Sequence, residues 1–339
     1  MSSDAAHRAA VLGAGSWGTA LAVHLGDRGR DVQLWGRDSA LMGEMADRRA
    51  NPTYLPDVTF PDHLNPTGAL DEALNGARYV ILAIPSHGMR SVLREAAPHL
   101  PADAILVSAT KGIENDSLRR MSEVASEETG GRHPVVVLSG PSFAAEVARK
   151  LPTALVAAST DDAAVRAVQE EFRGSTFRLY ASDDVPGVEI GASLKNIIAI
   201  AAGVVESLHL GHNAMAALIT RGLAEISRLA GAMGGRRETL AGLSGLGDLV
   251  LTCTGNLSRN RHVGIELGRG RALQDVLAGM RMVAEGVRTT TAALALGERY
   301  GVELPIAAQM AEVLAGRLTP RDAVVTLMVR PQRDELDGN

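Results

Sequence analysis

The first half of the chain alternates short apolar runs with stretches of helical periodicity. Several of these runs are apolar on both faces, which is typical of strands buried between two layers of helices. Strands in alternation with helices, the first expected over residues 19–28, predict a parallel, doubly wound sheet. Residues 51–65 hold three prolines and are expected to leave the sheet as an irregular excursion. The predicted strands are Ala9–Leu12, Asp31–Trp35, Tyr79–Ile84, Ala104–Ala109, Val135–Ser139, Ala154–Ala158 and Phe177–Tyr180.

After Gly187 the strand-like runs stop and helical periodicity dominates. A length of 339 residues also fits two domains better than a single core. We therefore expect an α/β domain over residues 1–187 and an all-helical domain over residues 188–339. The predicted helices of the second domain cover residues 188–208, 213–233, 261–267, 287–300 and 305–314.

Composition and charge exclude several classes of partner and site. The net charge of −5, without a block of like charges, argues against nucleic acid or an anionic membrane as the main partner. A single cysteine, Cys253, excludes an internal disulfide, and the nine histidines lack the paired spacing of a metal site, so no metal is expected. The N-terminus has no long apolar stretch, and the longest apolar run, Ile197–Val205, is about half of a membrane span. We expect a cytoplasmic protein.

A glycine turn, Gly13-Ala14-Gly15-Ser16-Trp17-Gly18, directly follows the first predicted strand. In this pattern the first glycine allows the tight turn, the second lets the backbone approach a pyrophosphate, and the third lets helix and strand pack closely. The pyrophosphate then lies at the helix N-terminus, where free N–H groups and the helix dipole favour an anion. Because the turn stands between a strand and a helix, we interpret Gly13, Gly15 and Gly18 as part of a dinucleotide-binding site.

The end of the second strand bears on the choice of dinucleotide. An acidic residue at this place holds the ribose 2′-OH of NAD, whereas an arginine can accept the 2′-phosphate of NADP. The chain reads Trp35-Gly36-Arg37-Asp38, so the arginine comes first. We expect NADP to be tolerated and leave NAD open as the cofactor, the alternative for Arg37 being a solvated surface charge.

Two lysines are candidates for chemistry. Lys111 follows a buried strand, at the end where ligands bind in open α/β sheets. Lys195 lies inside the helix predicted over residues 188–208, and residues 197–205 that follow it are nearly all apolar, so that this helix is expected to be buried. A buried lysine shifts its pKa readily and can serve in proton transfer, whereas the alternative is a salt-bridged lysine at a domain interface.

Two further polar clusters accompany the lysines. Asp248 and Thr252 are four residues apart and share one face of a helix, although Asp248 also suits a simple N-cap. Ser258, before a helical run, is a good N-cap, and the free N–H groups beside Arg259 form an anion site that a substrate phosphate would fit. Taken alone, this second cluster is equally a plain capped helix.

Together and in this order, the motifs resemble those of the bacterial-type, NAD(P)-dependent sn-glycerol-3-phosphate dehydrogenases, over nearly the whole chain. Besides the glycine turn they are Pro85-Ser86-His87, Ala109-Thr110-Lys111-Gly112, Ser139-Gly140-Pro141-Ser142-Phe143-Ala144, Leu194-Lys195-Asn196, Leu218-Ile219-Thr220-Arg221-Gly222, Gly245-Leu246-Gly247-Asp248-Leu249, Ser258-Arg259-Asn260-Arg261 and Glu285-Gly286.

The resemblance implies a Rossmann domain followed by an all-helical domain, with the active site between them. It implies reduction of dihydroxyacetone phosphate to sn-glycerol 3-phosphate, a phospholipid precursor, with Lys195 as proton donor and acceptor. We expect Asp248 to orient Lys195 and Lys111 to add positive charge nearby. The dinucleotide contacts that it implies are Ser16, Trp17, Arg37, Lys111, Ala144, Arg259, Val283 and Glu285. The implied substrate contacts are Gly140, Ser142, Lys111, Lys195, Asp248, Ser258, Arg259 and Asn260, to which we add the neighbouring Asn196 and Thr252.

Two other functions stay open at this point. A related two-domain dehydrogenase of the 3-hydroxyacid or 6-phosphogluconate type also pairs a glycine turn with a lysine and a nearby asparagine on a helix. A sensor that binds NAD(P) without turnover would share the turn but would not need a buried lysine. The sequence also leaves open the preference between NAD and NADP, feedback regulation and the oligomeric state, with a homodimer compatible with the apolar helical faces.

Overall fold

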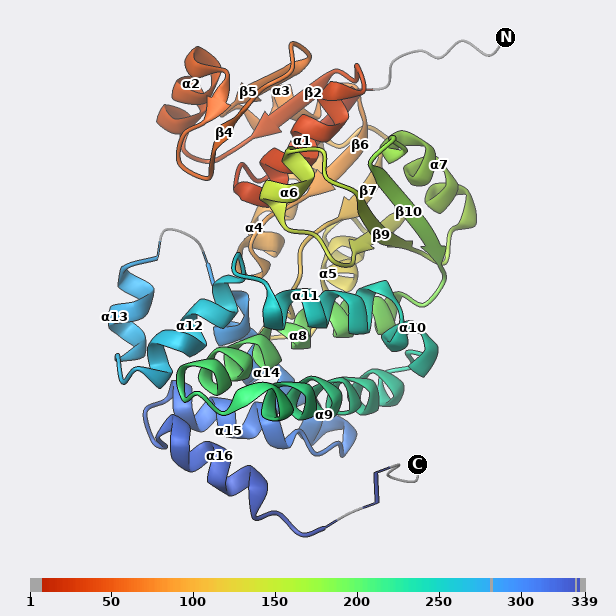
Figure 1. Cartoon of the computed structure of the whole chain (residues 1–339). Helices are drawn as coiled ribbons and strands as arrows, with labels where there is room; N and C mark the ends of the chain where they lie inside the picture. Colours follow the sequence, from red (N-terminus) through yellow and green to blue (C-terminus); the bar gives the residue numbers. More distant parts are fainter. Residues whose placement is uncertain (1–7, 281–282, 333, 336–339) are drawn as a thin grey trace.

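The computed structural model describes residues 8–280, 283–332 and 334–335, which form a sheet domain followed by a helical domain (Figure 1). The main sheet has eight strands in the order β10-β9-β8-β7-β6-β1-β2-β5. Its strands are β1 (Arg8–Leu12), β2 (Val32–Trp35), β5 (Leu64–Thr67), β6 (Ala77–Leu82), β7 (Ile105–Ser108), β8 (Val135–Ser139), β9 (Thr153–Ala158) and β10 (Phe177–Ser182), and β3 (Ala50–Asn51) pairs with β4 (Leu55–Thr59) in a second, small sheet.

Helices cover both faces of the main sheet, and each face has its own apolar core. One core takes residues from α1 (Ser16–Asp27), α2 (Ser39–Arg48), α6 (Ala144–Ala148) and α7 (Asp162–Phe172). The other takes residues from α3 (Leu70–Leu74), α4 (Met89–Ala96) and α5 (Met121–Glu128), and the short turns η1 (Ser86–Gly88) and η2 (Ala97–His99) flank α4. The inner strands are therefore buried on both faces, as their apolar sequences predict, whereas the edge strands β5 and β10 are partly exposed.

The seven strands predicted from sequence are confirmed, with two corrections to the sheet. The excursion predicted over residues 51–65 is partly wrong, because β5 begins at Leu64 and joins the main sheet as its edge strand beside β2. Pro66 is tolerated there because an edge strand pairs on one side only. The sheet is also not wholly parallel, since β8 and β9 pair antiparallel. Their connection carries only the five-residue helix α6 and returns along the sheet edge.

The order of strands reverses at β1, which lies between β2 and β6. Chain connections leave in opposite directions from such a point, so that a crevice opens outside the carboxyl ends of the two central strands. Gly13 follows β1, and Ala83 follows β6, at this place. The glycine turn therefore lies where a doubly wound sheet binds its ligand.

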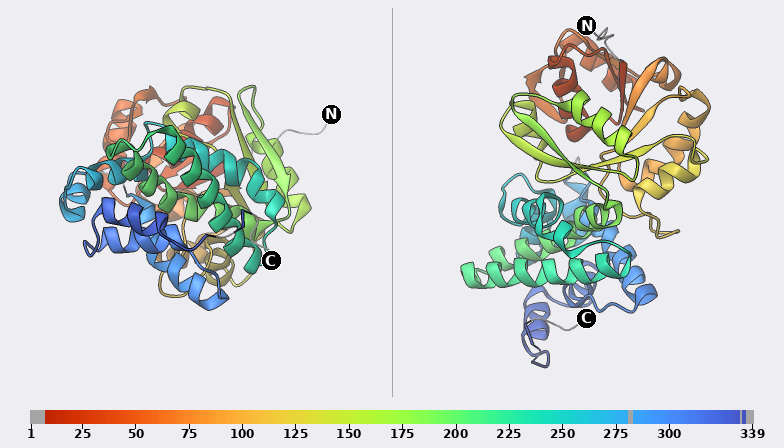
Figure 2. Two further views of the ribbon diagram at one scale, coloured as in Figure 1. Left: turned by 60° about the horizontal axis from the view of Figure 1, so that its bottom comes forward. Right: turned by 90° about the vertical axis from the view of Figure 1, so that its right-hand side faces the viewer.

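The helical domain is built around α8 (Val185–Ser207), most of whose residues are buried. By length and composition alone α8 could cross a membrane, but its most apolar stretch lies entirely inside the protein, as in the core helix of a folded domain. Figure 2 shows this domain packed against one end of the sheet domain. The remaining helical elements are α9 (Gly211–Ala232), α10 (Arg237–Ala241), η3 (Leu243–Gly247), α11 (Asp248–Thr254), α12 (Arg259–Gly268), α13 (Leu273–Ala278), α14 (Glu285–Tyr300), α15 (Pro305–Leu314) and α16 (Pro320–Met328).

Two glycines let α8 and α12 touch backbone to backbone. A Cβ atom added at Gly203 would lie 2.0 Å from the carbonyl oxygen of Arg261, and one at Gly264 would lie 1.9 Å from that of Ile200. Side chains of any size would separate the helices at this crossing. The contact fixes the first half of α12 beside the C-terminal part of α8.

Candidate active site

The two candidate lysines meet on one carboxylate, although they come from different domains. Lys195 Nζ lies 2.5 Å from Asp248 Oδ1, and Lys111 Nζ lies 2.8 Å from Asp248 Oδ2. Lys195 comes from α8, Asp248 begins α11, and Lys111 lies in the segment after β7. Asp248 is 1% exposed, so both ion pairs are shielded from water on the carboxylate side. The structure thus brings together the three residues predicted to carry the chemistry.

The ammonium of Lys195 keeps one donor free among the described residues. A lysine ammonium has three N–H donors. One lies toward Asp248, and a second lies 2.7 Å from Thr252 Oγ1, whose own hydroxyl donates to the carbonyl oxygen of Asp248 at 2.6 Å. Thr252 lies one helical turn after Asp248, as its spacing predicts. The third donor is available to an oxygen of a ligand.

Burial sets the protonation of Lys195. The side chain is almost wholly buried, and removal from water lowers the pKa of Lys195 to about 8, while Asp248 opposes the shift and Lys111 adds to it. Lys195 therefore holds its proton at neutral pH but releases it far more readily than an exposed lysine. That is the property that general acid–base catalysis requires of a side chain.

The loop after β8 carries two of the predicted substrate contacts. Gly140 has a φ of +130°, a conformation that favours glycine, and its carbonyl oxygen accepts hydrogen bonds from Lys111 Nζ at 3.0 Å and from Ser142 Oγ at 3.1 Å. Ala144, at the start of α6, follows in the same segment. Gly140 and Ser142 thus adjoin the lysine pair.

The start of α12 has the capped N-terminus that the sequence predicts. Ser258 Oγ accepts a hydrogen bond from the backbone N–H of Arg261 at 3.2 Å. Arg259 is the first residue of the helix and is exposed, and its guanidinium has no hydrogen-bond or ion-pair partner among the described residues. A free cation beside a helix N-terminus is suited to a phosphate group.

Asn196 and Asn260 connect α8, α12 and α14. Asn260 Nδ2 donates to Asn196 Oδ1 at 3.0 Å, and Asn260 Oδ1 accepts from the backbone N–H of Gly286 at 2.9 Å. Both asparagines are buried. Their amide groups therefore fix the position of Arg259 relative to Lys195, in addition to any contact with substrate.

The glycine turn has the geometry needed to hold a dinucleotide. A Cβ at Gly13, whose φ is +115°, would lie 2.4 Å from the carbonyl oxygen of Ala83, and one at Gly18 would lie 1.8 Å from that of Gly13. A Cβ at Gly15 would meet no protein atom within 4 Å, so the space in front of it is free for a pyrophosphate. No side chain of the described residues caps the N-terminus of α1, which leaves its N–H groups for an anion.

Arg37 follows β2, next to this turn, and Trp17 lies within the turn. Arg37 is exposed and donates from Nη2 to Ser91 Oγ at 3.0 Å. The indole Nε1 of Trp17 is buried without an acceptor among the described residues. Ser16 Oγ donates to the carbonyl oxygen of Tyr54 at 2.9 Å. The open space at Gly15 and the exposed guanidinium of Arg37 fit a dinucleotide along α1, whereas the expected contacts of Ser16 and Trp17 with it stay predictions.

Glu285 and Val283 lie where the sheet domain meets α14. Glu285 accepts hydrogen bonds from the backbone N–H and the hydroxyl of Ser86, at 3.0 and 2.6 Å. Val283 precedes α14 and is 36% exposed. The carboxylate of Glu285 is thus occupied by Ser86, and its expected contact with the dinucleotide stays a prediction.

Sequence reasoning missed two residues that support the site. Asn51 is fully buried and donates from Nδ2 to the carbonyl oxygen of Ala14 and to Thr19 Oγ1, at 3.0 and 2.7 Å, so that it braces the glycine turn. It lies in the proline-containing segment that looked irregular. Ser86 was quoted in a motif but given no role, and only its pairing with Glu285 shows one.

A glycine turn at the switch point of the sheet, together with two lysines on a shared carboxylate where the domains meet, is the arrangement expected of a two-domain dehydrogenase. Family models described as the N-terminus and the C-terminus of NAD-dependent glycerol-3-phosphate dehydrogenase match residues 8–165 and 184–325. The chain belongs to the NAD-dependent glycerol-3-phosphate dehydrogenase family.

Individual relatives agree with the family models. The glycerol-3-phosphate dehydrogenase (NAD(P)+) of Syntrophotalea carbinolica is 53% identical, over 96% of this chain and 99% of that protein. The one of Koribacter versatilis is 53% identical, over 79% of this chain and 81% of that protein. The crystal structure of the glycerol-3-phosphate dehydrogenase from Coxiella burnetii superposes with a TM-score of 0.92 at 42% identity, over 96% of this chain and 99% of that one.

Proposed function

We propose that this enzyme reduces dihydroxyacetone phosphate to sn-glycerol 3-phosphate with NADH or NADPH, and catalyses the reverse oxidation. Family membership supports the reaction. The observation that assigns this reaction to particular residues is the pairing of Lys195 and Lys111 with Asp248 where the domains meet. A non-catalytic sensor would have no use for a buried lysine with a lowered pKa and a free donor. We further propose the domain boundary near Gly187, a cytoplasmic location, a role in glycerophospholipid synthesis and a homodimer.

Each residue has a separate part in the proposed mechanism. The bound dinucleotide supplies a hydride for the carbonyl carbon or takes it back from the alcohol. Lys195, protonated, gives its proton to the carbonyl oxygen as that oxygen gains negative charge, so that an alcohol and a neutral amine result. In the reverse direction the neutral amine removes the hydroxyl proton. Lys111 adds positive charge, and Asp248 holds both ammonium groups in place.

The phosphate of the substrate would bind at the start of α12. Arg259 supplies a free guanidinium, and the first backbone N–H groups of the helix supply donors. Because the phosphate is remote from the reacting carbon, its binding energy can be used to position that carbon. The asparagine pair between α8 and α12 supports this role, since it fixes the anion site relative to Lys195.

Initial rates with purified enzyme test the proposal. We expect NADH or NADPH to be oxidised with dihydroxyacetone phosphate, and NAD(P)+ to be reduced with sn-glycerol 3-phosphate. Rates with a 3-keto acid and with 6-phosphogluconate should be lower by orders of magnitude. Binding of NAD(P)H without turnover of any of these substrates would instead favour a sensor.

The rate should depend on pH in opposite ways in the two directions. With a pKa of about 8, Lys195 is protonated at lower pH, so kcat/KM for dihydroxyacetone phosphate should fall as the pH rises above that value. The value for sn-glycerol 3-phosphate should rise over the same range, because oxidation needs the neutral amine. Binding of NAD(P)H, followed by fluorescence, serves as the control for folding. If kcat/KM changed with pH in the same way in both directions, the assignment of Lys195 would be contradicted.

Replacing Arg37 should change the use of NADPH more than that of NADH. Loss of a charged hydrogen bond to the 2′-phosphate in Arg37→Ala should raise KM for NADPH by about tenfold and KM for NADH by less than about twofold. Arg48→Ala is the matched control, because Arg48 lies on the next helix and pairs with Glu44. Equal changes in KM for NADPH and NADH would show that Arg37 is only a solvated surface charge.

A further inference from the structure

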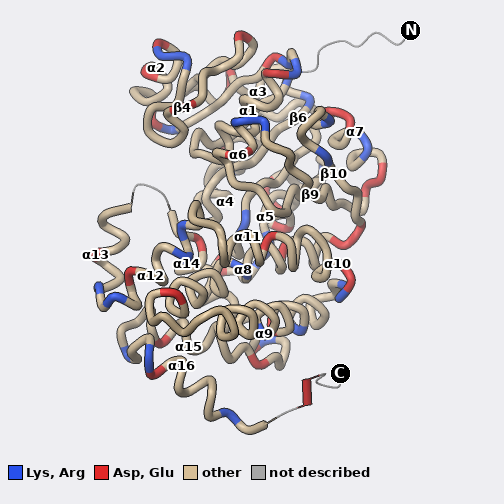
Figure 3. The backbone as a smooth tube through the Cα atoms, viewed as in Figure 1, with Lys and Arg blue, Asp and Glu red and all other residues tan. Residues whose placement is uncertain are grey.

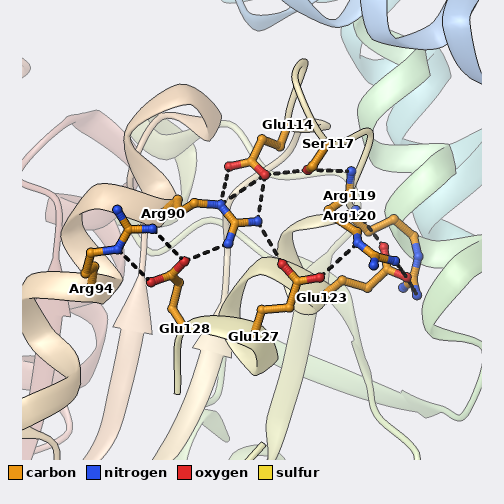
Figure 4. Close-up of polar contacts among 9 residues, drawn as sticks. All are labelled: Arg90, Arg94, Glu114, Ser117, Arg119, Arg120, Glu123, Glu127 and Glu128. Carbon is orange, nitrogen blue, oxygen red and sulfur yellow. Dashed lines mark hydrogen bonds and ion pairs between the residues drawn. The ribbon is translucent and has the colours of Figure 1, made fainter. Parts of the chain in front are cut away.

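The segment that carries Lys111 is fastened to the rest of the protein by ionic contacts that the reaction itself does not use. We call residues 109–120, between β7 and α5, the Lys111 loop. It turns back on itself, with Leu118 at a φ of +59° and a bridge between Ile113 and Arg120. Figure 4 shows the charged groups around this loop, from α4, α5 and the loop itself.

Arg90 of α4 holds the loop through Glu114, three residues after Lys111. Arg90 Nε lies 2.8 Å from Glu114 Oε1, and Arg90 Nη2 lies 2.7 Å from Glu114 Oε2, which is a two-point contact of fixed geometry. Ser117 donates to the same carboxylate and so closes the turn of the loop around it. Glu114 therefore attaches the part of the loop next to Lys111 to α4, while Arg119, nearer the end of the loop, pairs with Glu127 of α5.

Arg90 is in turn held by α5. Its Nη1 lies 2.6 Å from Glu128 Oε1, and its Nη2 lies 2.8 Å from Glu127 Oε2. The hydrogen bond with Glu114, followed by those with Glu127 and Glu128, raises the pKa of Arg90, and the same contact lowers the pKa of Glu114. The Arg90 side chain is 26% exposed and that of Glu114 is 15% exposed, so the pair is less screened than one on the open surface.

The other side of the loop is fastened to the helical domain. Ile113, two residues after Lys111, is 2% exposed and packs in the core that contains α8. At the end of the loop, Arg120 Nη1 lies 2.6 Å from Glu189 Oε2 on the same helix, which also carries Lys195. Glu189 further accepts from the backbone N–H of Ser122 at 2.8 Å. The loop thus spans both domains, with Lys111 at one end.

We propose that Arg90 is a positioning residue, which through Glu114 sets the place of Lys111 against Asp248. The inference rests on the proposed function, since it assigns Lys111 a part in that reaction. Arg90 belongs to α4, whereas Lys111 reaches Asp248 from the loop, so Arg90 acts on the ammonium through the loop: directly through Glu114, and more remotely through Glu127, which also pairs with Arg119 of the loop. Its loss should leave the dinucleotide turn intact while it loosens one of the two charges beside the reacting oxygen.

Kinetics of Arg90→Gln test the proposal. We expect kcat for dihydroxyacetone phosphate to fall by about tenfold, which corresponds to about 1.4 kcal/mol, while KM for NADH changes by less than about twofold. We also expect the alkaline limb of kcat/KM to move to higher pH, because Lys111 in place lowers the pKa of Lys195. Arg90→Lys should recover part of kcat, since it restores one ionic contact.

The matched control is Arg94→Gln, one helical turn further along α4. Arg94 contacts only Glu128 of this cluster, and its side chain is 70% exposed. This variant should keep kcat within about twofold of the wild type. Glu114→Gln tests the contact between Arg90 and Glu114 from the loop side. The double variant Arg90→Gln/Glu114→Gln should be no slower than Arg90→Gln, since Arg90→Gln already removes the contact with Glu114 together with those to Glu127 and Glu128.

A chemical readout follows the place of Lys111 without any turnover. The chain has three lysines, and Lys150, exposed and paired with Asp27, serves as the internal reference. With a limiting amount of an amine-acylating reagent and mass spectrometry, modification of Lys111 relative to Lys150 should increase several-fold in Arg90→Gln and stay unchanged in Arg94→Gln.

The outcomes separate this inference from the proposed function. A wild-type enzyme without activity on dihydroxyacetone phosphate would refute the function, and the labelling ratio would still test the place of Lys111. If the wild type is active and Arg90→Gln has the same kcat, the same pH dependence of kcat/KM and the same labelling of Lys111, the inference is overturned. So would equal losses in Arg90→Gln and Arg94→Gln, or additive losses in the double variant. If Arg90→Gln does not fold, Glu114→Gln decides by the same measurements.

Discussion

Lys195→Met should retain NAD(P)H binding and lose turnover by about 10³-fold to 10⁴-fold, because the variant lacks both the proton donor and the charge that stabilises the developing oxyanion. Methionine preserves most of the side-chain volume in a site where Lys195 is 5% exposed, so the core of the helical domain should stay packed. Asp248 keeps its pair with Lys111 at 2.8 Å and is not left as an isolated buried charge. Single-turnover kinetics with enzyme in excess measure the chemical step directly.

The control for Lys195→Met is Lys150→Met, at an exposed lysine of the sheet domain that pairs with Asp27. It should have the wild-type rate. A Lys195→Met enzyme with activity within about tenfold of the wild type would show that another group donates the proton. Loss of NAD(P)H binding together with turnover would show that the substitution disturbs the fold and not the chemistry alone.

Asp248→Asn should inactivate the enzyme and destabilise it by about 3 kcal/mol at neutral pH. The substitution keeps the shape of the side chain but leaves two ammonium groups without the carboxylate that both contact. Removing one partner of a buried ion pair typically costs about 3–5 kcal/mol, since the remaining charge is uncompensated. Urea unfolding of the wild type and the variant measures the difference.

The stability loss in Asp248→Asn should depend on pH with a defined sign. Burial already lowers the pKa of Lys195 in the folded state, and removal of Asp248, which opposes that shift, should lower it further. Between the lowered pKa of Lys195 in the folded variant and the ordinary lysine pKa of about 10.4, the unfolded chain binds more protons than the folded chain, so the stability of the variant should increase as the pH rises through this range. The wild type gains stability in this way only from a pH of about 8 upward, so the stability loss should shrink as the pH rises toward 8. Asn256→Ala, in the exposed turn before α12, provides a variant in which no such dependence is expected. A loss that does not vary with pH would point to packing as its cause.

Much of the fold could be predicted because a strand or helix that is buried on all sides has a continuous apolar sequence. Most of the seven predicted strands are apolar runs inside the sheet, whereas the edge strand β10 alternates buried and exposed residues, and α8 shows its burial through residues 197–205. β5 has no such apolar sequence, because an edge strand with Asn65 and Pro66 does not need to be apolar or to donate on both sides. The direction of β9 depends on how a short connection returns, which periodicity does not contain.

The site was less evident from local pattern than the fold. Lys195, Asp248 and Ser258 stand out individually, but 53 residues separate Lys195 from Asp248, and only the resemblance joined them before the structure did. Ser86 and Glu285 are hydrogen-bonded although they lie 199 positions apart, and Arg90 lies outside all the motifs identified in the sequence. These contacts depend on tertiary packing, so no single segment predicts them. Charges of both signs are interspersed over both domains (Figure 3), so the functional charges do not stand out by number.

The glycine crossing between α8 and α12 has a consequence for which substrates the enzyme can accept. With Gly203 and Gly264 in close contact with the facing backbone, α8, which carries Lys195, and α12, which begins at Arg259, are held at a fixed distance from each other, and in the proposed mechanism these are the proton donor and the phosphate site. A ligand one carbon longer would have to fit the same distance between Lys195 and the start of α12, because neither helix can slide without a clash at the crossing. We therefore expect chain length to be selected by the scaffold itself, and redesign toward longer phosphates to begin at this crossing and not at the residues that contact substrate.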